Sequence, residues 1–310
     1  MSTQFHHVNS IGEKNRISSL EDNLKDFMDW SFLQVGGFIN VNIPTSGVKS
    51  SDFHTLVPVS EPSERSKVWE APRKDWVYES GVSYSSTSPI EISGVYLNNT
   101  FLPAPSGTGN YTYRMNHSLG RIDFDNFISS RSKVQLEYSY RYIQTYKANE
   151  SYWWKEFQFD TFDPSKIRTS GDYAITANHR IQLPSIMIET IPRTVMTPKE
   201  IGNSSNIILQ DVLLHVFSQN INQRNNIVDM LLVQKDNTIN LYDTNLVIKN
   251  NLYPLNRDGT INSNGLMYPD LSTSYAKYWC NIKNSTITEL NNISSSLYNG
   301  IVRWSIEIFP

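Results

Sequence analysis

The chain has 310 residues, enough for one large hydrophobic core or two ordinary ones. Its 27 basic and 30 acidic residues give a formal charge of −3, which provides no electrostatic reason to expect nucleic acid as the main partner. A single cysteine, Cys280, excludes an intramolecular disulfide and a cysteine-based metal site. The sequence has neither an apolar run of membrane-spanning length nor a secretory signal pattern, so we expect a soluble protein that folds in a reducing cytoplasm and has no membrane partner.

An amphipathic helix is predicted within an N-terminal arm over residues 1–37. Ser18 and Glu21 fit a capping box, in which each side chain satisfies a free N–H group, and Gly36-Gly37 ends the helix. The apolar stripe consists of Leu20, Leu24, Phe27, Met28 and Phe32. The residues expected in solvent are Glu21, Asp22, Lys25 and Asp26. The helix either covers the core of its own domain or docks on a neighbour, and the sequence leaves both possibilities open.

Residues 38–146 alternate between apolar and polar side chains, which is typical of strands with one buried and one wet face. The alternating segments are 38–43, 95–97, 101–102, 111–115, 121–125 and 134–141. Asn98-Asn99 separates two of them as a turn, and Pro and Gly fill other gaps. Short strands at such spacing indicate an antiparallel sandwich or barrel, and of the two we predict a β-sandwich domain over residues 38–146.

Aromatic residues are concentrated in a connector over residues 147–180, outside any long periodic run. We consider Tyr152, Trp153, Trp154, Phe157 and Phe159 as a candidate interface. Three interpretations stay open: these rings fill a seam between two domains, anchor a subunit interface, or stack on sugars or bases. Aromatic anchors often dominate the energy of protein interfaces.

Residues 181–310 combine strands with a helix. The expected strands are 181–191, 207–217, 238–242, 278–290 and 302–308. Asn222 is the expected cap of a helix whose apolar face holds Ile227, Val228, Met230 and Leu231, and a long polar connection is expected over 250–275. The fold class predicted for the whole chain is therefore mainly β and α+β: an N-terminal helix, an antiparallel β-sandwich, and an α+β domain with a helix packed on a sheet.

The sequence contains no nucleotide-binding fingerprint, nucleophile elbow or zinc-protease motif. Asp123 and Asp125 lie two apart on a predicted strand and are the best carboxylate pair for glycoside hydrolysis, but the alternation around them favours a solvated strand face. We therefore expect no catalytic residues, no metal and no cofactor, and hence a protein that is not an enzyme.

Two parts of the chain resemble virion structural proteins of tailed bacteriophages. In the first half the similarity lies in residues 92–101, 120–124 and 134–140, a hairpin followed by a Gly-led strand and a tyrosine-rich strand. In the second half, residues 211–218 and 227–231 resemble the strand-to-helix passage of tail-terminator proteins, and the closing strand at 303–307 suits the same sheet.

This resemblance implies a structural component of the head–tail neck or tail end that forms a homo-oligomeric ring. Its partners would be copies of itself and other neck, tail-tube or sheath proteins, and its location would be the virion, after assembly in the host cytoplasm. The alternative from a different class is a carbohydrate-binding β module of a fibre or adhesin, which would also explain the richness in Tyr, Trp and Asn.

Overall fold

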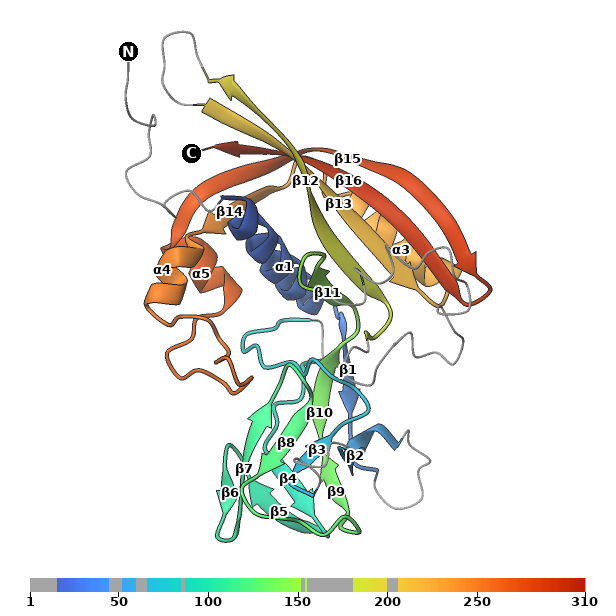
Figure 1. Cartoon of the computed structure of the whole chain (residues 1–310), viewed down its shortest axis with the longest axis vertical. Coiled ribbons are helices and arrows are strands. Elements are labelled where there is room, and N and C mark those ends of the chain that lie inside the picture. The colour runs from blue at the N-terminus through green and yellow to red at the C-terminus, as the bar shows by residue number, and fades with distance from the viewer. Residues whose placement is uncertain are drawn as a thin grey trace.

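The computed structural model describes residues 16–44, 52–59, 66–84, 87–151, 154, 181–199 and 206–309. The fold is mainly β (Figure 1): an N-terminal helix, an eight-stranded antiparallel near-barrel, and a curled six-stranded mixed sheet with few helices. The mainly β class and the N-terminal helix are thus confirmed. The curled sheet lies at one end of the molecule and the near-barrel at the other.

The near-barrel is one sheet that bends round on itself, with strand order β5-β4-β9-β2-β3-β8-β7-β6 and antiparallel pairing throughout. Its strands are β2 (Thr55–Pro58), β3 (Val68–Glu70), β4 (Gly94–Leu97), β5 (Thr100–Pro103), β6 (Gly107–Thr108), β7 (Tyr111–Asn116), β8 (Arg121–Phe124) and β9 (Val134–Leu136). A short 3₁₀ helix, Asp52–His54, precedes β2. Of the two architectures that the strand spacing indicates, the structure has the barrel-like one, and the predicted sandwich of two facing sheets is wrong. Alternation specifies one inward face, but it does not specify whether that face meets a second sheet or itself.

The turn at Asn98-Asn99 is confirmed, since both residues have positive φ (50° and 67°) between β4 and β5. The alternating segment 134–141, however, is divided between β9 and β10 (Tyr138–Arg141), and β10 pairs with β1 (Phe38–Val41) as a separate ribbon. The expected wet face of this segment is also wrong. Gln135, Ser139 and Arg141 are all at most 5% exposed, because other parts of the chain cover both faces.

The curled sheet has the order β11-β12-β13-β16-β15-β14, and only the β11–β12 pair is parallel. Its strands are β11 (Gln144–Lys147), β12 (Ser185–Pro198), β13 (Asn206–Ser218), β14 (Thr238–Tyr242), β15 (Ala276–Ser294) and β16 (Leu297–Phe309). The expected shared face of β16 is confirmed: Val302, Trp304, Ile306 and Ile308 are fully buried. They form the core of the sheet's concave side together with residues of β12, β13 and two helices.

Helix α3 (Ile221–Leu232) packs on β13, β15 and β16, as the sequence predicts, but its cap differs. The Asn220 side chain, not that of Asn222, accepts hydrogen bonds from the first free N–H groups of the helix. Ile227, Val228 and Leu231 are buried, whereas Met230 is exposed. The expected polar connection contains one short helix, α5 (Tyr268–Ser274), and another, α4 (Thr244–Lys249), directly precedes it.

Helix α1 (Arg16–Gln34) lies on the concave side of the curled sheet of its own chain, against β11, β12 and β14. Leu20, Leu24, Met28 and Phe32 belong to the same core as β13 and β16. The helix begins at Arg16, so the predicted capping box at Ser18 lies within the helix and does not start it. The open question of where this helix packs is thereby answered.

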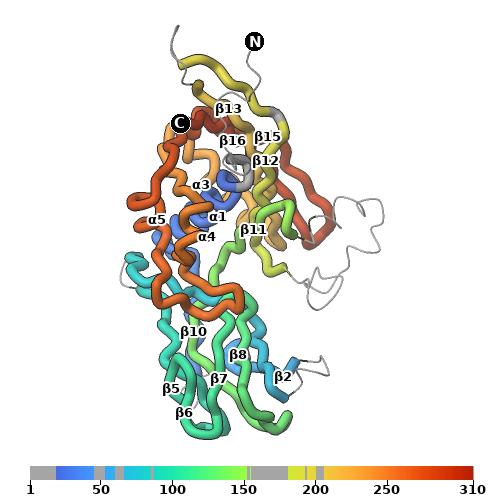
Figure 2. Tube along the Cα trace, turned by 60° about the vertical axis from the view of Figure 1, so that its left-hand side comes forward, coloured from blue at the N-terminus to red at the C-terminus, as the bar shows by residue number. Residues whose placement is uncertain are grey.

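The near-barrel is inserted between α1 and the rest of the curled sheet. The chain leaves α1 through Gly36-Gly37, enters the ribbon β1, completes the near-barrel, and returns through β10 to β11 (Figure 2). Gly36 has φ of 84°, a conformation that favours glycine. The near-barrel and the curled sheet are therefore joined by two short stretches of chain and by the side chains that pack between them.

We expect Leu24→Ala to destabilise the protein by about 2–5 kcal/mol, because Leu24 is fully buried in the core of the curled sheet. Urea denaturation measures the change. Val35→Ala, at a position 55% exposed, is the control and should change stability by less than about 0.5 kcal/mol. Equal effects of the two substitutions would contradict the placement of α1.

Candidate functional site

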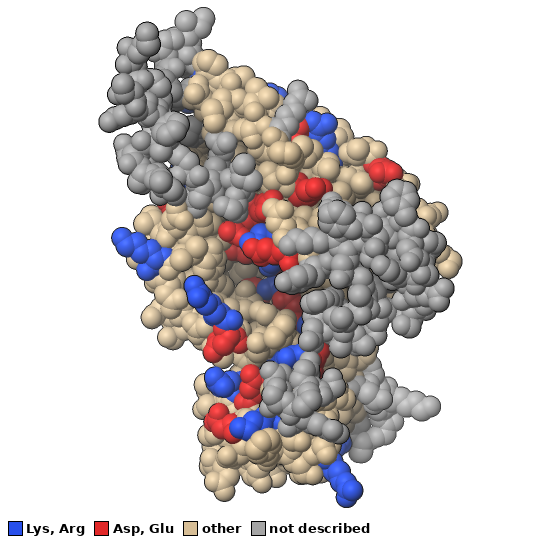
Figure 3. Space-filling view, in the orientation of Figure 1, with Lys and Arg blue, Asp and Glu red and all other residues tan. Residues whose placement is uncertain are grey.

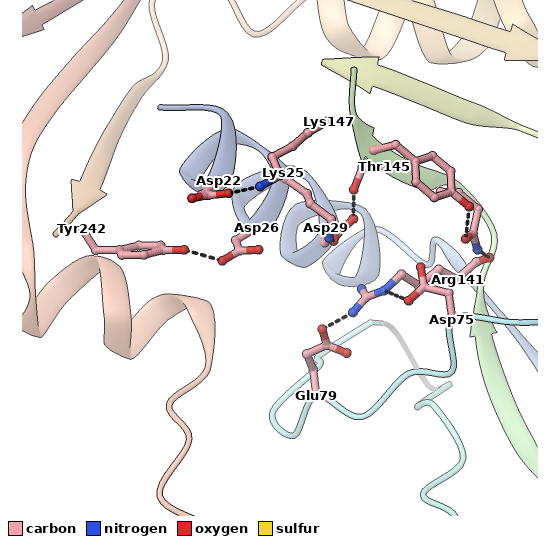
Figure 4. Close-up of polar contacts among 12 residues, drawn as sticks. Asp22, Lys25, Asp26, Asp29, Asp75, Glu79, Arg141, Thr145, Lys147 and Tyr242 are labelled. Carbon is pink, nitrogen blue, oxygen red and sulfur yellow. Dashed lines mark hydrogen bonds and ion pairs between the residues drawn. The ribbon is translucent and has the colours of Figure 1, made fainter. Parts of the chain in front are cut away.

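Charged side chains gather where α1 meets the near-barrel, around the middle of the molecule (Figure 3). Asp22, Lys25, Asp26 and Asp29 are spaced at helical intervals on α1, so they share the side of the helix that faces away from the sheet core (Figure 4). The prediction that Glu21, Asp22, Lys25 and Asp26 lie in solvent is wrong. Glu21 and Asp29 are at most 7% exposed, and Asp22, Lys25 and Asp26 are half-buried.

Arg141, the last residue of β10, is the central cation of this cluster. It is 3% exposed and forms ion pairs with Glu79 and, at 3.4 Å, with Asp75. Its guanidinium also lies 5.5 Å from the centre of the Tyr78 ring. Burial opposes the charged form, but the carboxylates of Glu79 and Asp29 outweigh it, so the pKa of Arg141 is raised. Arg141 therefore stays charged inside the molecule and fixes the 75–79 loop against β10.

Asp29 connects helix α1 to the other side of the junction. Lys25 Nζ donates to Asp29 at 2.6 Å, and the Thr145 hydroxyl in β11 donates to its second oxygen. Burial opposes ionisation of Asp29, yet the charges of Lys25 and Arg141 outweigh it and lower the pKa of this carboxyl. Two turns earlier on the helix, Asp22 accepts from Lys147 Nζ at 2.6 Å. These contacts hold α1 to β11.

Asp26 points the other way, toward β14 (Figure 4). The Tyr242 hydroxyl donates to Asp26 at 2.6 Å, and Asn23 exchanges hydrogen bonds with the Tyr242 backbone. Burial raises the pKa of Asp26 to about 6, which exceeds the lowering effect of Lys25 and of the Tyr242 hydrogen bond. Asp26 is therefore a carboxyl that changes charge near neutral pH.

A cavity of about 180 Å³ lies beside this cluster, between α1, the 78–79 loop and residues 253–271. Four aromatic side chains line it: Trp30, Tyr78, Tyr253 and Tyr268. Three carboxylates line it as well: Asp26, Asp29 and Glu79. Aromatic faces and hydrogen-bond acceptors in one concave site can hold a small ligand that has both apolar faces and donor groups. Each of the three carboxylates already has a partner within the protein.

Of the predicted interface aromatics, only Trp154 belongs to the described residues; Tyr152, Trp153, Phe157 and Phe159 lie outside them. Trp154 is 5% exposed and lies 4.3 Å, between ring centres, from His215 of β13. It belongs to a small core with Met187 and Phe217. This core uses side chains of β12 and β13 that alternate with those of the concave core, so Trp154 covers the opposite face of the curled sheet.

Asp123 lies half-buried in β8, and Asp125 follows the end of that strand and is exposed. Across the described ranges, no three His, Cys, Asp or Glu side chains come together in a way that could hold a metal ion. No helix in that part of the chain has both the length and the apolar character required to cross a bilayer.

Among the described strands, a long segment of β12 at one edge of the curled sheet has no neighbour on its outer side. Strand β11 pairs with it only over Ser185–Ile188, and Glu21 accepts from the Thr190 N–H. Beyond that point, no described strand pairs with the outer edge of β12. The exposed fractions there are 40% for Val195 and 57% for Met196. Unpaired edges with exposed apolar side chains are templates for pairing with another chain.

A second open edge belongs to β15, on the other side of the same sheet. Strand β14 pairs with β15 only over Ala276–Asn281, and among the described strands none covers the outer edge of its remainder. Ile287 is 41% exposed and Leu290 is 49% exposed on this segment. Three register shifts against β16 interrupt its regular pairing. Within the described ranges, the sheet thus has an unpaired edge segment on each side.

Comparison with known proteins adds no family to this description: no family model matches the sequence, and no curated protein matches it.

Sequence reasoning missed the charge cluster because its residues follow the patterns of an exposed surface. Asp22, Lys25, Asp26 and Asp29 look like the wet face of an amphipathic helix, and Arg141 looks like the wet position of an alternating strand. A local signal does not separate the two cases, since only the insertion of the near-barrel places Arg141 opposite α1.

We expect Asp26→Asn to stabilise the protein at pH 7.5. The folded state holds a proton on Asp26 up to about pH 6, against an ordinary value of 3.8, so wild-type stability falls as pH rises through this interval. Asparagine removes that loss and still accepts from Tyr242. Because Asp26 keeps some exposure, we expect a gain of about 1–2 kcal/mol at pH 7.5 and almost none at pH 4.

Urea denaturation at the two pH values measures this difference. The control is Asp22→Asn, one turn away, which loses its ion pair with Lys147 and should gain no stability at pH 7.5. An Asp26→Asn variant that is less stable than wild type at pH 7.5 would show that the carboxylate is favourably solvated.

Proposed function

We propose that this chain is a non-enzymatic structural component of a tailed-phage particle, which joins or completes the head–tail neck or the tail end as a homo-oligomeric ring. The proposal starts from the resemblance of residues 211–231 and 303–307 to tail-terminator proteins. Those residues supply β13, α3 and β16, which pack together as a helix on a sheet. On this proposal residues 181–310 act as an α+β, terminator-like domain.

The observation that carries the proposal is the pair of open edges on the curled sheet. A sheet edge is a row of unpaired donors and acceptors, and soluble proteins usually shorten, charge or cover it. Here β12 is 14 residues long and β15 is 19 residues long, and both have exposed apolar side chains on the open segment. Such edges suit a protein that works by pairing with neighbours.

The partners on this proposal are copies of the same chain in a ring and other neck, tail-tube or sheath proteins. The ring would be located in the virion after assembly in the host cytoplasm. Head-to-tail contacts between identical subunits close into a ring when the rotation between neighbours divides the circle. The near-barrel, which projects away from the curled sheet, would then be available for a different partner from the one at the sheet edges.

Quantitative mass spectrometry of purified virions tests the proposal. We expect a fixed number of copies per particle, at a ratio to the tail proteins that does not change between preparations. Antibody labelling should place the chain at the neck or the tail end. In an infection in which the chain is not made, unjoined heads and tails should accumulate. Normal particles that lack the chain would contradict the proposal.

A carbohydrate-binding module is a second candidate, and the cavity at the junction favours it. Trp30, Tyr78, Tyr253 and Tyr268 provide rings on which sugars stack, and the carboxylates beside them accept hydrogen bonds from hydroxyl groups. This candidate does not use the open sheet edges.

The second candidate predicts that Trp30→Ala weakens binding to an oligosaccharide at least tenfold, as measured by calorimetry after a glycan-array screen. Trp279→Ala is the matched control, since Trp279 is 44% exposed on the curled sheet and stacks on Phe309 outside the cavity. A screen that finds no sugar ligand, or equal losses in both variants, would exclude this cavity as the sugar site.

A further inference from the structure

The two open edges of the curled sheet fit one another. We infer that the free segment of β15 in one copy adds to the free segment of β12 in a second copy, as an antiparallel strand. This inference rests on the proposed ring and names the contact that would build it. Its partner is a second copy of this chain.

The directions of the strands permit this pairing. From β12 through β13 and β16 to β15, every neighbouring pair is antiparallel, so β12 and β15 run in opposite directions within one sheet. A rotation about an axis that lies roughly along the sheet brings β15 of the next copy beside β12 and does not reverse the direction of either strand. The new contact is therefore antiparallel, which is the pairing that continues the existing sheet.

The lengths and positions of the open segments also match. On β12 the segment 189–198 follows the part that pairs with β11, and on β15 the segment 285–294 lies beyond the part that pairs with β14. Placing Ile287 opposite Met196 aligns the two segments along their length, with the bulge of β12 between Thr190 and Thr194 and the register shifts of β15 as interruptions of the pairing. In that register β11 lies beyond the turn of the β15–β16 hairpin and β14 lies beyond the end of β12, so neither short strand obstructs the contact.

The exposed apolar side chains then meet on one face. Met196 lies opposite Ile208, Ile287 lies opposite Val302, and cross-strand partners share a face of the sheet. Because Ile208 and Val302 belong to the concave core, Met196 and Ile287 point to the concave side as well. Pairing the two edges removes both exposed side chains from water. The register shifts of β15 make its edge irregular, so these side chains select the partner.

The stagger between the segments predicts the shape of the assembly. Within one chain the cross-strand register places Ile287 in the same row of the sheet as Ile188, whose partner on β13 is Leu214. The partner of Met196 on β13 is Ile208, six residues from Leu214, so Ile287 and Met196 are offset by about 20 Å along the strands. Each copy adds the four strands β12, β13, β16 and β15, which span about 19 Å. A ring without rise then requires strands inclined by about 45° to its axis, close to the tilt at which strands close into barrels.

Cysteine cross-linking tests the contact in purified particles and in concentrated protein. Two single variants, Met196→Cys and Ile287→Cys, are mixed and treated with a short reagent that joins two thiols. We expect a covalent dimer in the mixture and a ladder of multimers from the double variant, with no product from either single variant. Cys280 does not interfere, because it is fully buried and burial raises its pKa to about 12.

The matched control replaces Met196→Cys by Val57→Cys, which is 56% exposed on the near-barrel against 57% for Met196, and it should give no dimer with Ile287→Cys. A dimer from Ile287→Cys alone would mean that β15 pairs with itself, and would overturn the inference. The absence of cross-links in particles that contain the protein in fixed copy number would overturn the contact and leave the proposed function standing. Absence of the protein from particles would instead remove the proposed function.

Discussion

The buried charges along helix α1 and around Arg141 are the constraint on which the arrangement of the molecule depends. Helix α1 is buried on two sides: its apolar stripe completes the core of the curled sheet, and its acidic side faces the near-barrel insertion. A helix with charged residues on one side normally leaves that side in water. Here Lys25 pairs with Asp29 and Arg141 pairs with Glu79, and the charges of Lys25 and Arg141 lower the pKa of Asp29 despite its burial.

Buried ion pairs add little net stability when both charges lose their hydration, but removing one partner is costly. The cluster therefore acts less as a source of stability than as a specification of geometry. Arg141 ends β10 and Thr145 is the second residue of β11, so the same few residues connect the strand that leaves the near-barrel with the strand that enters the curled sheet. A change in how α1 sits would be transmitted to both sheets through these contacts.

The two ends of the molecule handle their strand edges differently. In the near-barrel the single sheet bends until β5 and β6 come into contact, which removes most of its open edge. The curled sheet instead keeps open segments on β12 and β15, and it keeps Val195, Met196, Ile287 and Leu290 exposed beside them. This contrast within one chain is the physical basis for assigning assembly to the curled sheet.

The sequence by itself determined the elements with a strong local period: the helix stripe from Leu20 to Phe32, the turn at Asn98-Asn99, and the buried face from Val302 to Ile308. Period and turn chemistry act between near neighbours, so they can be read without the fold. Tertiary structure alone decided that the near-barrel is one bent sheet, and that α1 belongs to the last strands of the chain. It also decided that Asp29 and Arg141 are buried. Asp29 and its hydrogen-bond partner Thr145 are more than a hundred residues apart in the sequence. A local sequence pattern does not indicate which distant segment will cover a polar face.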